Sequence, residues 1–236
     1  DEKKLTAYHE AGHAIVGLHM PQHDPLHKVT IIPRGRALGV TMSLPERDRH
    51  SMSKQFCLSR IASMFGGRVA EELIFGPENV TSGASSDIQQ ATRLARAMVM
   101  EWGMSESLGR VRYTSNEQEV FLGHSVTQTT NISPETARLI DDEIRRLIVD
   151  GENNARRILT DRNNDLHSLA KALLEYETLS GDEIKALLRG DPIVRPDADE
   201  PPPKTPGRRA SVPTTGSSPG RERPEGGLKP EPQPGA

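Results

Sequence analysis

The run His9-Glu10-Ala11-Gly12-His13 places two imidazoles and one carboxylate close together near the start of the chain. On an α-helix, residues four apart lie on one face, one turn above each other, so both histidines could bind a single metal ion. The glutamate would then lie near enough to exchange a proton with a water at that metal. The pattern H-E-x-x-H is typical of zinc metalloproteases and indicates hydrolysis of peptide bonds.

The segment that carries this motif has apolar residues at helical spacing. Leu5, Tyr8 and Ile15 belong to an apolar stripe that recurs every three or four residues, and Pro21 follows it. The pattern predicts a helix over residues 3–20. The two motif histidines would lie beside this stripe and be partly buried, where a metal ion would satisfy imidazole nitrogens that otherwise lack a partner.

A third protein ligand is expected, because catalytic zinc usually takes three protein side chains and leaves one position for water. Glu71 and Glu72 are candidates, since many zinc peptidases use a glutamate from a later helix. Asp87 is the other candidate. It follows a loop of small residues and lies in the first turn of an expected helix, where the helix dipole favours an ionised carboxylate. The spacing leaves both open, with a slight preference for Asp87.

The elements that must position these side chains form a mostly α-helical pattern with a small β-element near the site and a C-terminal helical bundle. Two strands are expected over residues 29–32 and 37–44, joined by a turn. Further helices are expected over residues 53–75, 86–102, 134–161, 165–176 and 181–190, with 111–113 a candidate strand. The start signals are Ser86 with Gln89, Ser133 before Pro134, and Ser180 with Glu183.

Composition divides the chain in two. The chain has 236 residues, a net charge of -3 and 34% hydrophobic residues, which suits one sizeable core with an unstructured remainder. Twelve of its 18 prolines fall after residue 191. We therefore expect a zinc metallopeptidase domain over residues 1–191 and a disordered, proline-rich tail over residues 192–236.

Several classes of protein are disfavoured by the same composition. A nearly balanced charge and only 3% aromatic residues argue against nucleic acid as a partner. Cys57 is the only cysteine, so an internal disulfide is excluded. The sequence has no apolar run long enough to cross a bilayer and no signal peptide, and it opens without methionine. It is expected to be a soluble fragment of a longer protein.

Several fragments together resemble the peptidase domain of the FtsH family over about residues 1–190. They resemble bacterial members more than organellar ones. They include TAYHEAGHAIV, FGGRVAEELIFG and TSGASSDIQQATRLARAMVMEWGMSESLG. Members are membrane-anchored, ATP-dependent zinc metalloproteases of the AAA+ class. The resemblance implies one Zn²⁺ per chain, held by His9, His13 and the aspartate of the G-A-S-x-D loop, Asp87. It implies Glu10 as the catalytic base. Ser86 stands where the family often has asparagine.

The resemblance also implies partners and a location. The expected substrates are unfolded proteins or peptides, and the expected role is protein quality control. Family members are hexameric, and residues 133–188 are expected to supply subunit contacts. The AAA+ ATPase and the transmembrane segments would precede Asp1 in the full-length chain, on the cytoplasmic side of the bacterial inner membrane. No G-x-x-x-x-G-K-[ST] motif occurs here, so this chain is not expected to bind ATP by that route.

Two further interpretations compete with a zinc endopeptidase. One is a catalytically inactive module that assembles a ring, which would have no need of Glu10. The other is a purely structural zinc site, which would require four protein ligands.

Two weaker signals accompany the motif. The segment 39–42 is either an ordinary strand or an exposed strand edge that holds an extended substrate by main-chain hydrogen bonds. His19, His23 and His27 repeat every four residues, but prolines interrupt any helix there, so they read as surface histidines.

Overall fold

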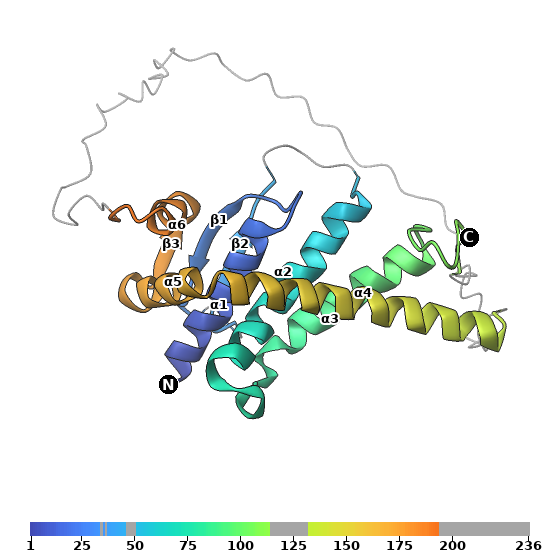
Figure 1. Ribbon diagram of the computed structural model, residues 1–236, viewed down its shortest axis with the longest axis horizontal. Helices are drawn as coiled ribbons and strands as arrows, with labels where there is room; N and C mark the ends of the chain where they lie inside the picture. Colours follow the sequence, from blue (N-terminus) through green and yellow to red (C-terminus); the bar gives the residue numbers. More distant parts are fainter. Residues whose placement is uncertain (34, 36, 46–50, 114–131, 194–236) are drawn as a thin grey trace, which may run out of the picture. The chain divides into compact units, whose positions relative to one another are not determined.

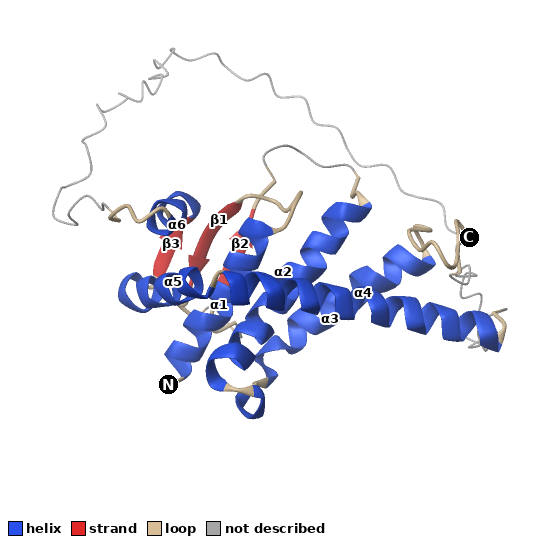
Figure 2. Ribbon diagram, viewed as in Figure 1, coloured by secondary structure: helices blue, strands red, loops and turns tan. Residues whose placement is uncertain are grey.

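The computed structural model describes residues 1–33, 35, 37–45, 51–113 and 132–193. Within these ranges most residues are helical (Figure 2), and the expected mostly α-helical fold is confirmed. The helices are α1 (Glu2–His19), α2 (Lys54–Phe75), α3 (Ser85–Met100), α4 (Pro134–Asp161), α5 (Asn163–Tyr176) and α6 (Gly181–Leu188). The strands are β1 (Leu26–Thr30), β2 (Val40–Ser43) and β3 (Thr178–Ser180), and two short 3₁₀ turns, η1 (Pro77–Asn79) and η2 (Ser82–Ala84), precede α3.

The three strands form one antiparallel sheet in the order β2-β1-β3. The predicted hairpin is confirmed, with Val29 of β1 opposite Thr41 of β2. The strand β1 begins earlier than expected, at Leu26, and β3 was not predicted at all. In this order β2 is an edge strand, and no described strand pairs with its outer side.

The helix that carries the motif packs closely against α2 through two glycines. A Cβ atom added to Gly66 would lie 2.5 Å from the main-chain oxygen of Gly12, which is closer than real Cβ contacts come. On either side of this crossing, Ala11, Ile15 and Val69 are fully buried. The close approach therefore brings the motif face of α1 directly against the backbone of α2.

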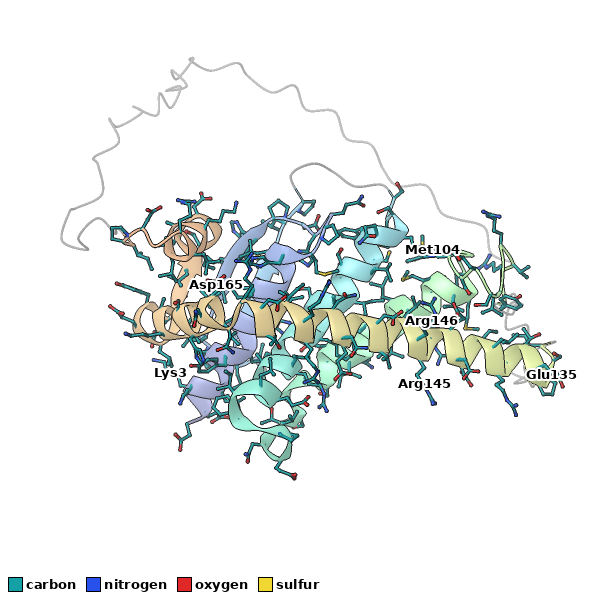
Figure 3. The ribbon with its side chains drawn as sticks, in the orientation of Figure 1. Lys3, Met104, Glu135, Arg145, Arg146 and Asp165 are labelled. Carbon is teal, nitrogen blue, oxygen red and sulfur yellow. The ribbon has the colours of Figure 1, made fainter. Side chains whose placement is uncertain are left out.

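The C-terminal helices α4 and α5 pack against α1 and α2, and α6 packs on α5 and the sheet (Figure 1). The helix α4 packs mainly on α2 and α3, and α5 packs on α1. Figure 3 labels Arg146 on α4 and Met104 on the segment that follows α3. Glu143 of α4 accepts hydrogen bonds from Arg146 and from Ser105 at 2.8 Å, which ties that segment to α4.

Two of the three predicted helix starts are confirmed. Ser133 caps α4, and Ser180 with Glu183 forms the predicted capping box at α6. The capping box at Ser86 is wrong, because α3 begins at Ser85, immediately after η2. The hydroxyl of Thr81 caps that 3₁₀ turn instead, so the chain is already wound when α3 begins.

The remaining expectations on chain organisation have mixed outcomes. Residues 111–113 are not a strand, because the amide of Tyr113 bonds back to the main-chain oxygen of Met100 and closes a loop onto α3. No described helix combines the length and apolar character that crossing a membrane requires. Residues 1–193 belong to one compact unit, while the expected tail lies outside the described residues from position 194 on. The domain boundary at residue 191 stays a prediction.

The glycine crossing between α1 and α2 predicts the effect of one methyl group. Gly12→Ala would drive a Cβ into the main-chain oxygen of Gly66, so we expect it to lower the free energy of unfolding by about 1–3 kcal/mol. Gly17→Ala, on the same helix, is the matched control. The nearest neighbours of its Cβ would be side-chain atoms rather than backbone, the ring of His23 at 3.1 Å and the hydroxyl of Ser63 at 3.3 Å, so we expect the free energy of unfolding to change by no more than about 1 kcal/mol. Urea unfolding measures both, and equal stabilities would contradict the packing argument.

Candidate metal centre

The two motif histidines face each other on one side of α1. Their rings are 4.7 Å apart between centroids, and the Nε2 atoms are 3.0 Å apart. Gly67 of α2 lies directly beneath them. A Cβ at Gly67 would lie 2.5 Å from Nε2 of His9 and 2.7 Å from Nε2 of His13, so a side chain at this position would displace both rings.

A carboxylate from a distant part of the chain completes the group. Asp87, in the first turn of α3, has its Oδ2 atom 3.3 Å from Nε2 of His9 and 3.4 Å from Nε2 of His13. In the described part of the chain, these three residues are the group with the spacing of a metal site. His19, His23 and His27 form no such group there, and His23 is half-buried rather than at the surface.

The outer nitrogens of both imidazoles are already engaged with acceptors. Nδ1 of His9 donates to Oε1 of Glu71 at 2.7 Å, and Nδ1 of His13 donates to the main-chain oxygen of Ser63 at 2.8 Å. A carboxylate and a carbonyl only accept, so in the neutral imidazoles the hydrogen is on Nδ1 and the lone pair on Nε2. Two nitrogen lone pairs and one carboxylate oxygen therefore converge, and a cation would satisfy all three.

The spacing of these atoms fits zinc. Nitrogen and oxygen ligands bind Zn²⁺ tetrahedrally at 2.0–2.1 Å, which puts neighbouring ligand atoms about 3.3 Å apart. The three separations are 3.0, 3.3 and 3.4 Å. Two imidazoles and one carboxylate are also a ligand set found in catalytic zinc sites, with a fourth position available for water.

Without a metal ion, a proton supplies part of the positive charge that these three residues attract. Burial lowers the pKa of His9, but its hydrogen bonds with Asp87 and Glu71 outweigh burial and raise that pKa to about 9. Burial raises the pKa of Asp87, yet its hydrogen bonds with His13 and His9 prevail and hold the pKa well below its usual range. The site is therefore built to attract positive charge.

The adjacent glutamates that could have supplied the third ligand have separate roles. Glu71 is fully buried behind His9, and its other oxygen, Oε2, accepts from the amide of Thr81 at 2.8 Å and from its hydroxyl at 3.1 Å. Glu72 instead pairs with Arg156 at 3.0 Å. The sequence had singled out Glu71 as a possible ligand, but its contact with the outer nitrogen of His9 was missed.

The expected base lies beside the ligands in a cleft of about 770 Å³. Glu10 is 7% exposed, and its Oε2 atom accepts a hydrogen bond of 2.6 Å from the hydroxyl of Thr41 on β2. The three ligand candidates, Glu10 and residues 37–43 all line this cleft. The edge strand β2 thus borders the same space as the metal-binding group.

Fold and site together define the class of zinc-dependent metallopeptidases. The chain belongs to peptidase family M41, whose family model matches residues 1–187. This match confirms that the chain is a peptidase, as predicted, and it favours an active peptidase over the inactive ring-assembly alternative. Together with the relatives named below, it confirms the predicted FtsH-type family.

Named relatives agree with this assignment. The chain is 65% identical over 195 residues to an ATP-dependent zinc metalloprotease FtsH of Caulobacter vibrioides, covering 83% of this chain and 31% of that protein. It is 55% identical over 188 residues to the FtsH of Photobacterium profundum, covering 80% and 27%. For the FtsH of Haemophilus influenzae the identity is 51% over 195 residues, covering 83% and 31%. The chain thus spans less than a third of the length of these relatives, whose names support zinc as the cofactor.

The contact between Glu71 and His9 predicts a change in metal affinity. Glu71→Gln keeps the shape of the side chain but removes the charge behind His9, so we expect zinc affinity to fall by ~10–100-fold. Glu72→Gln is the matched control, because the carboxylate of Glu72 pairs with Arg156 and not with His9. Competition with a chromophoric chelator measures both affinities. An equal loss in the two variants would contradict a specific role for Glu71.

Proposed function

We propose that this chain is the zinc endopeptidase domain of a longer ATP-dependent protease and that it hydrolyses peptide bonds of unfolded proteins. The observation that carries the proposal is the convergence of His9, His13 and Asp87 beside the buried carboxylate of Glu10. In this proposal the first three residues hold one Zn²⁺, and Glu10 is the general base. The shared cleft supports the proposal, because ligands and base both line it.

Each side chain has a distinct task in this reaction. Held by His9, His13 and Asp87, zinc would supply a Lewis acid that polarises the scissile carbonyl and makes water easier to deprotonate. Glu10 accepts the proton of the attacking water at its carboxylate and passes it to the nitrogen of the leaving amine. Glu71 holds His9 by its outer nitrogen, and the main-chain oxygen of Ser63 holds His13 in the same way, so both rings keep their orientation while the proton moves.

The substrate would bind as an extended segment along β2. This strand is at the edge of the sheet and borders the cleft, and main-chain pairing along it would position a peptide without strict demands on its sequence. Such pairing requires an extended chain, because a peptide bond within a helix or sheet already uses its hydrogen-bonding groups. Unfolded proteins and peptides are therefore the substrates that this geometry favours.

The longer protein would supply what this chain lacks. The relatives are named ATP-dependent, and this chain has no G-x-x-x-x-G-K-[ST] motif, so an AAA+ ATPase in the same full-length protein would unfold and deliver substrates. As the sequence resemblance implies, we propose a hexamer with contacts from the C-terminal helices α4–α6. We also propose membrane anchoring on the cytoplasmic side of a bacterial inner membrane and a role in protein quality control.

The role of Glu10 predicts a separation of metal binding from turnover. Glu10→Gln should keep one zinc per chain but lower kcat by at least ~10²-fold, because the amide cannot take a proton from water. The measurement is cleavage of an unfolded, fluorescently labelled protein by wild type and variant at matched zinc content. Cleavage by both at similar rates would sink the mechanism, and a chelator should stop the wild type until zinc is restored.

The role of Asp87 predicts loss of the metal itself. Asp87→Ala removes a proposed ligand, so zinc affinity should fall further than the ~10–100-fold expected for an outer partner such as Glu71. Metal analysis after dialysis against a weak chelator measures the zinc that remains bound. Stoichiometric zinc in Asp87→Ala would assign the third ligand elsewhere, to Glu71 or Glu72, the alternatives that the sequence left open.

A further inference from the structure

The hydroxyl of Thr41 on β2 contacts the side chain of Glu10 directly, and both residues line the cleft. Its Oγ1 atom is 2.6 Å from Oε2 of Glu10 and 3.1 Å from the main-chain oxygen of the same residue. A hydroxyl has one hydrogen to donate, and the shorter contact goes to a carboxylate, which is the stronger acceptor. The hydrogen bond therefore joins the edge strand to the carboxylate of Glu10.

The surroundings of Glu10 offer its carboxylate few hydrogen-bond partners other than Thr41. The residue is buried, and among the described residues no other hydrogen bond reaches its carboxylate. A Cβ atom at Gly39 would lie 2.7 Å from both Cγ and Oε1 of Glu10. The side chain of Glu10 thus lies against the hydroxyl of Thr41 and the bare Cα of Gly39, which are two residues apart along the chain.

We propose that Thr41 is a positioning residue for Glu10, whose hydrogen bond fixes the direction in which the carboxylate receives a proton. The inference rests on the proposed function, in which Glu10 is the base. A buried carboxylate that loses its donor turns toward another partner, and small misplacements of a reacting group slow a reaction strongly. The strand that borders the substrate cleft would then also orient the base, so both act in a fixed relative position.

The first test separates kcat from KM. Thr41→Val keeps the β-branched shape and removes only the hydroxyl, so we expect kcat to fall by ~10–100-fold with KM and zinc content nearly unchanged. Thr41→Ser restores the donor and should recover most of the lost rate. A wild-type kcat in Thr41→Val, or no recovery in Thr41→Ser, would overturn the proposal.

A matched control distinguishes positioning from general loss of stability. Thr30, on the adjacent strand β1, is a buried threonine where Thr41 is half-buried, and its hydroxyl bonds to Thr178 at 2.7 Å and approaches the main-chain oxygen of Glu177 at 3.2 Å. Thr30→Val should lower stability and leave kcat per zinc unchanged. If Thr30→Val lowers kcat as much as Thr41→Val does, Thr41 has no special role.

A second readout requires no turnover. In the metal-free chain, urea unfolding of Thr41→Val, Glu10→Ala and the double variant forms a double-mutant cycle. We expect the double variant to be less destabilised than the two single changes summed, because both remove the same hydrogen bond. Strictly additive effects would refute the contact. If wild-type chain with bound zinc fails to cleave, the proposed function is refuted, while this cycle still decides whether Thr41 holds Glu10.

Discussion

One buried carboxylate ties together the segments that build the site. Glu71, on α2, accepts a hydrogen bond from His9 of α1 through one oxygen and two from Thr81 through the other. Thr81 caps the 3₁₀ turn that leads into α3, which carries Asp87. A fully buried carboxylate is costly unless donors surround it, so the folded chain satisfies Glu71 only when both segments approach. The arrangement of the metal-binding group follows from satisfying this one side chain.

The same site also depends on glycines, which have no side chain to keep the two helices apart. The α1–α2 crossing brings backbone against backbone at Gly12 and Gly66, and the imidazoles of His9 and His13 then occupy the space above Gly67. Glycine within a helix costs about 1 kcal/mol relative to alanine. The chain accepts this cost at Gly12, Gly66 and Gly67, because a Cβ atom at any of them would push the helices or the imidazole rings apart. Tight packing at this crossing and correct placement of the histidines are therefore the same constraint.

The sequence predicted features that depend on neighbours along the chain and missed those that depend on distant partners. Helical spacing located α1 and its H-E-x-x-H face, because residues four apart meet in any α-helix. The choice between Glu71 and Asp87 stayed open, because it depends on how α2 and α3 pack rather than on spacing. The strand β3 was missed for the same reason, since its few residues pair with β1 nearly 150 positions earlier. The hydrogen bond from Thr41 to Glu10 likewise exists only once β2 lies over α1.

The position of Glu10 argues for catalysis over a structural metal site. A structural zinc requires four protein ligands, whereas the group in the described part of the chain has three. A module that only assembles a ring gains nothing from a buried carboxylate beside those ligands, and burying it opposes folding unless a donor is supplied. Here Thr41 of the edge strand supplies that donor, and Gly39, immediately before the strand, supplies the space. The proposed metal ligands, the proposed base and the strand edge thus border one cleft, which is the arrangement that the proposed peptide hydrolysis requires.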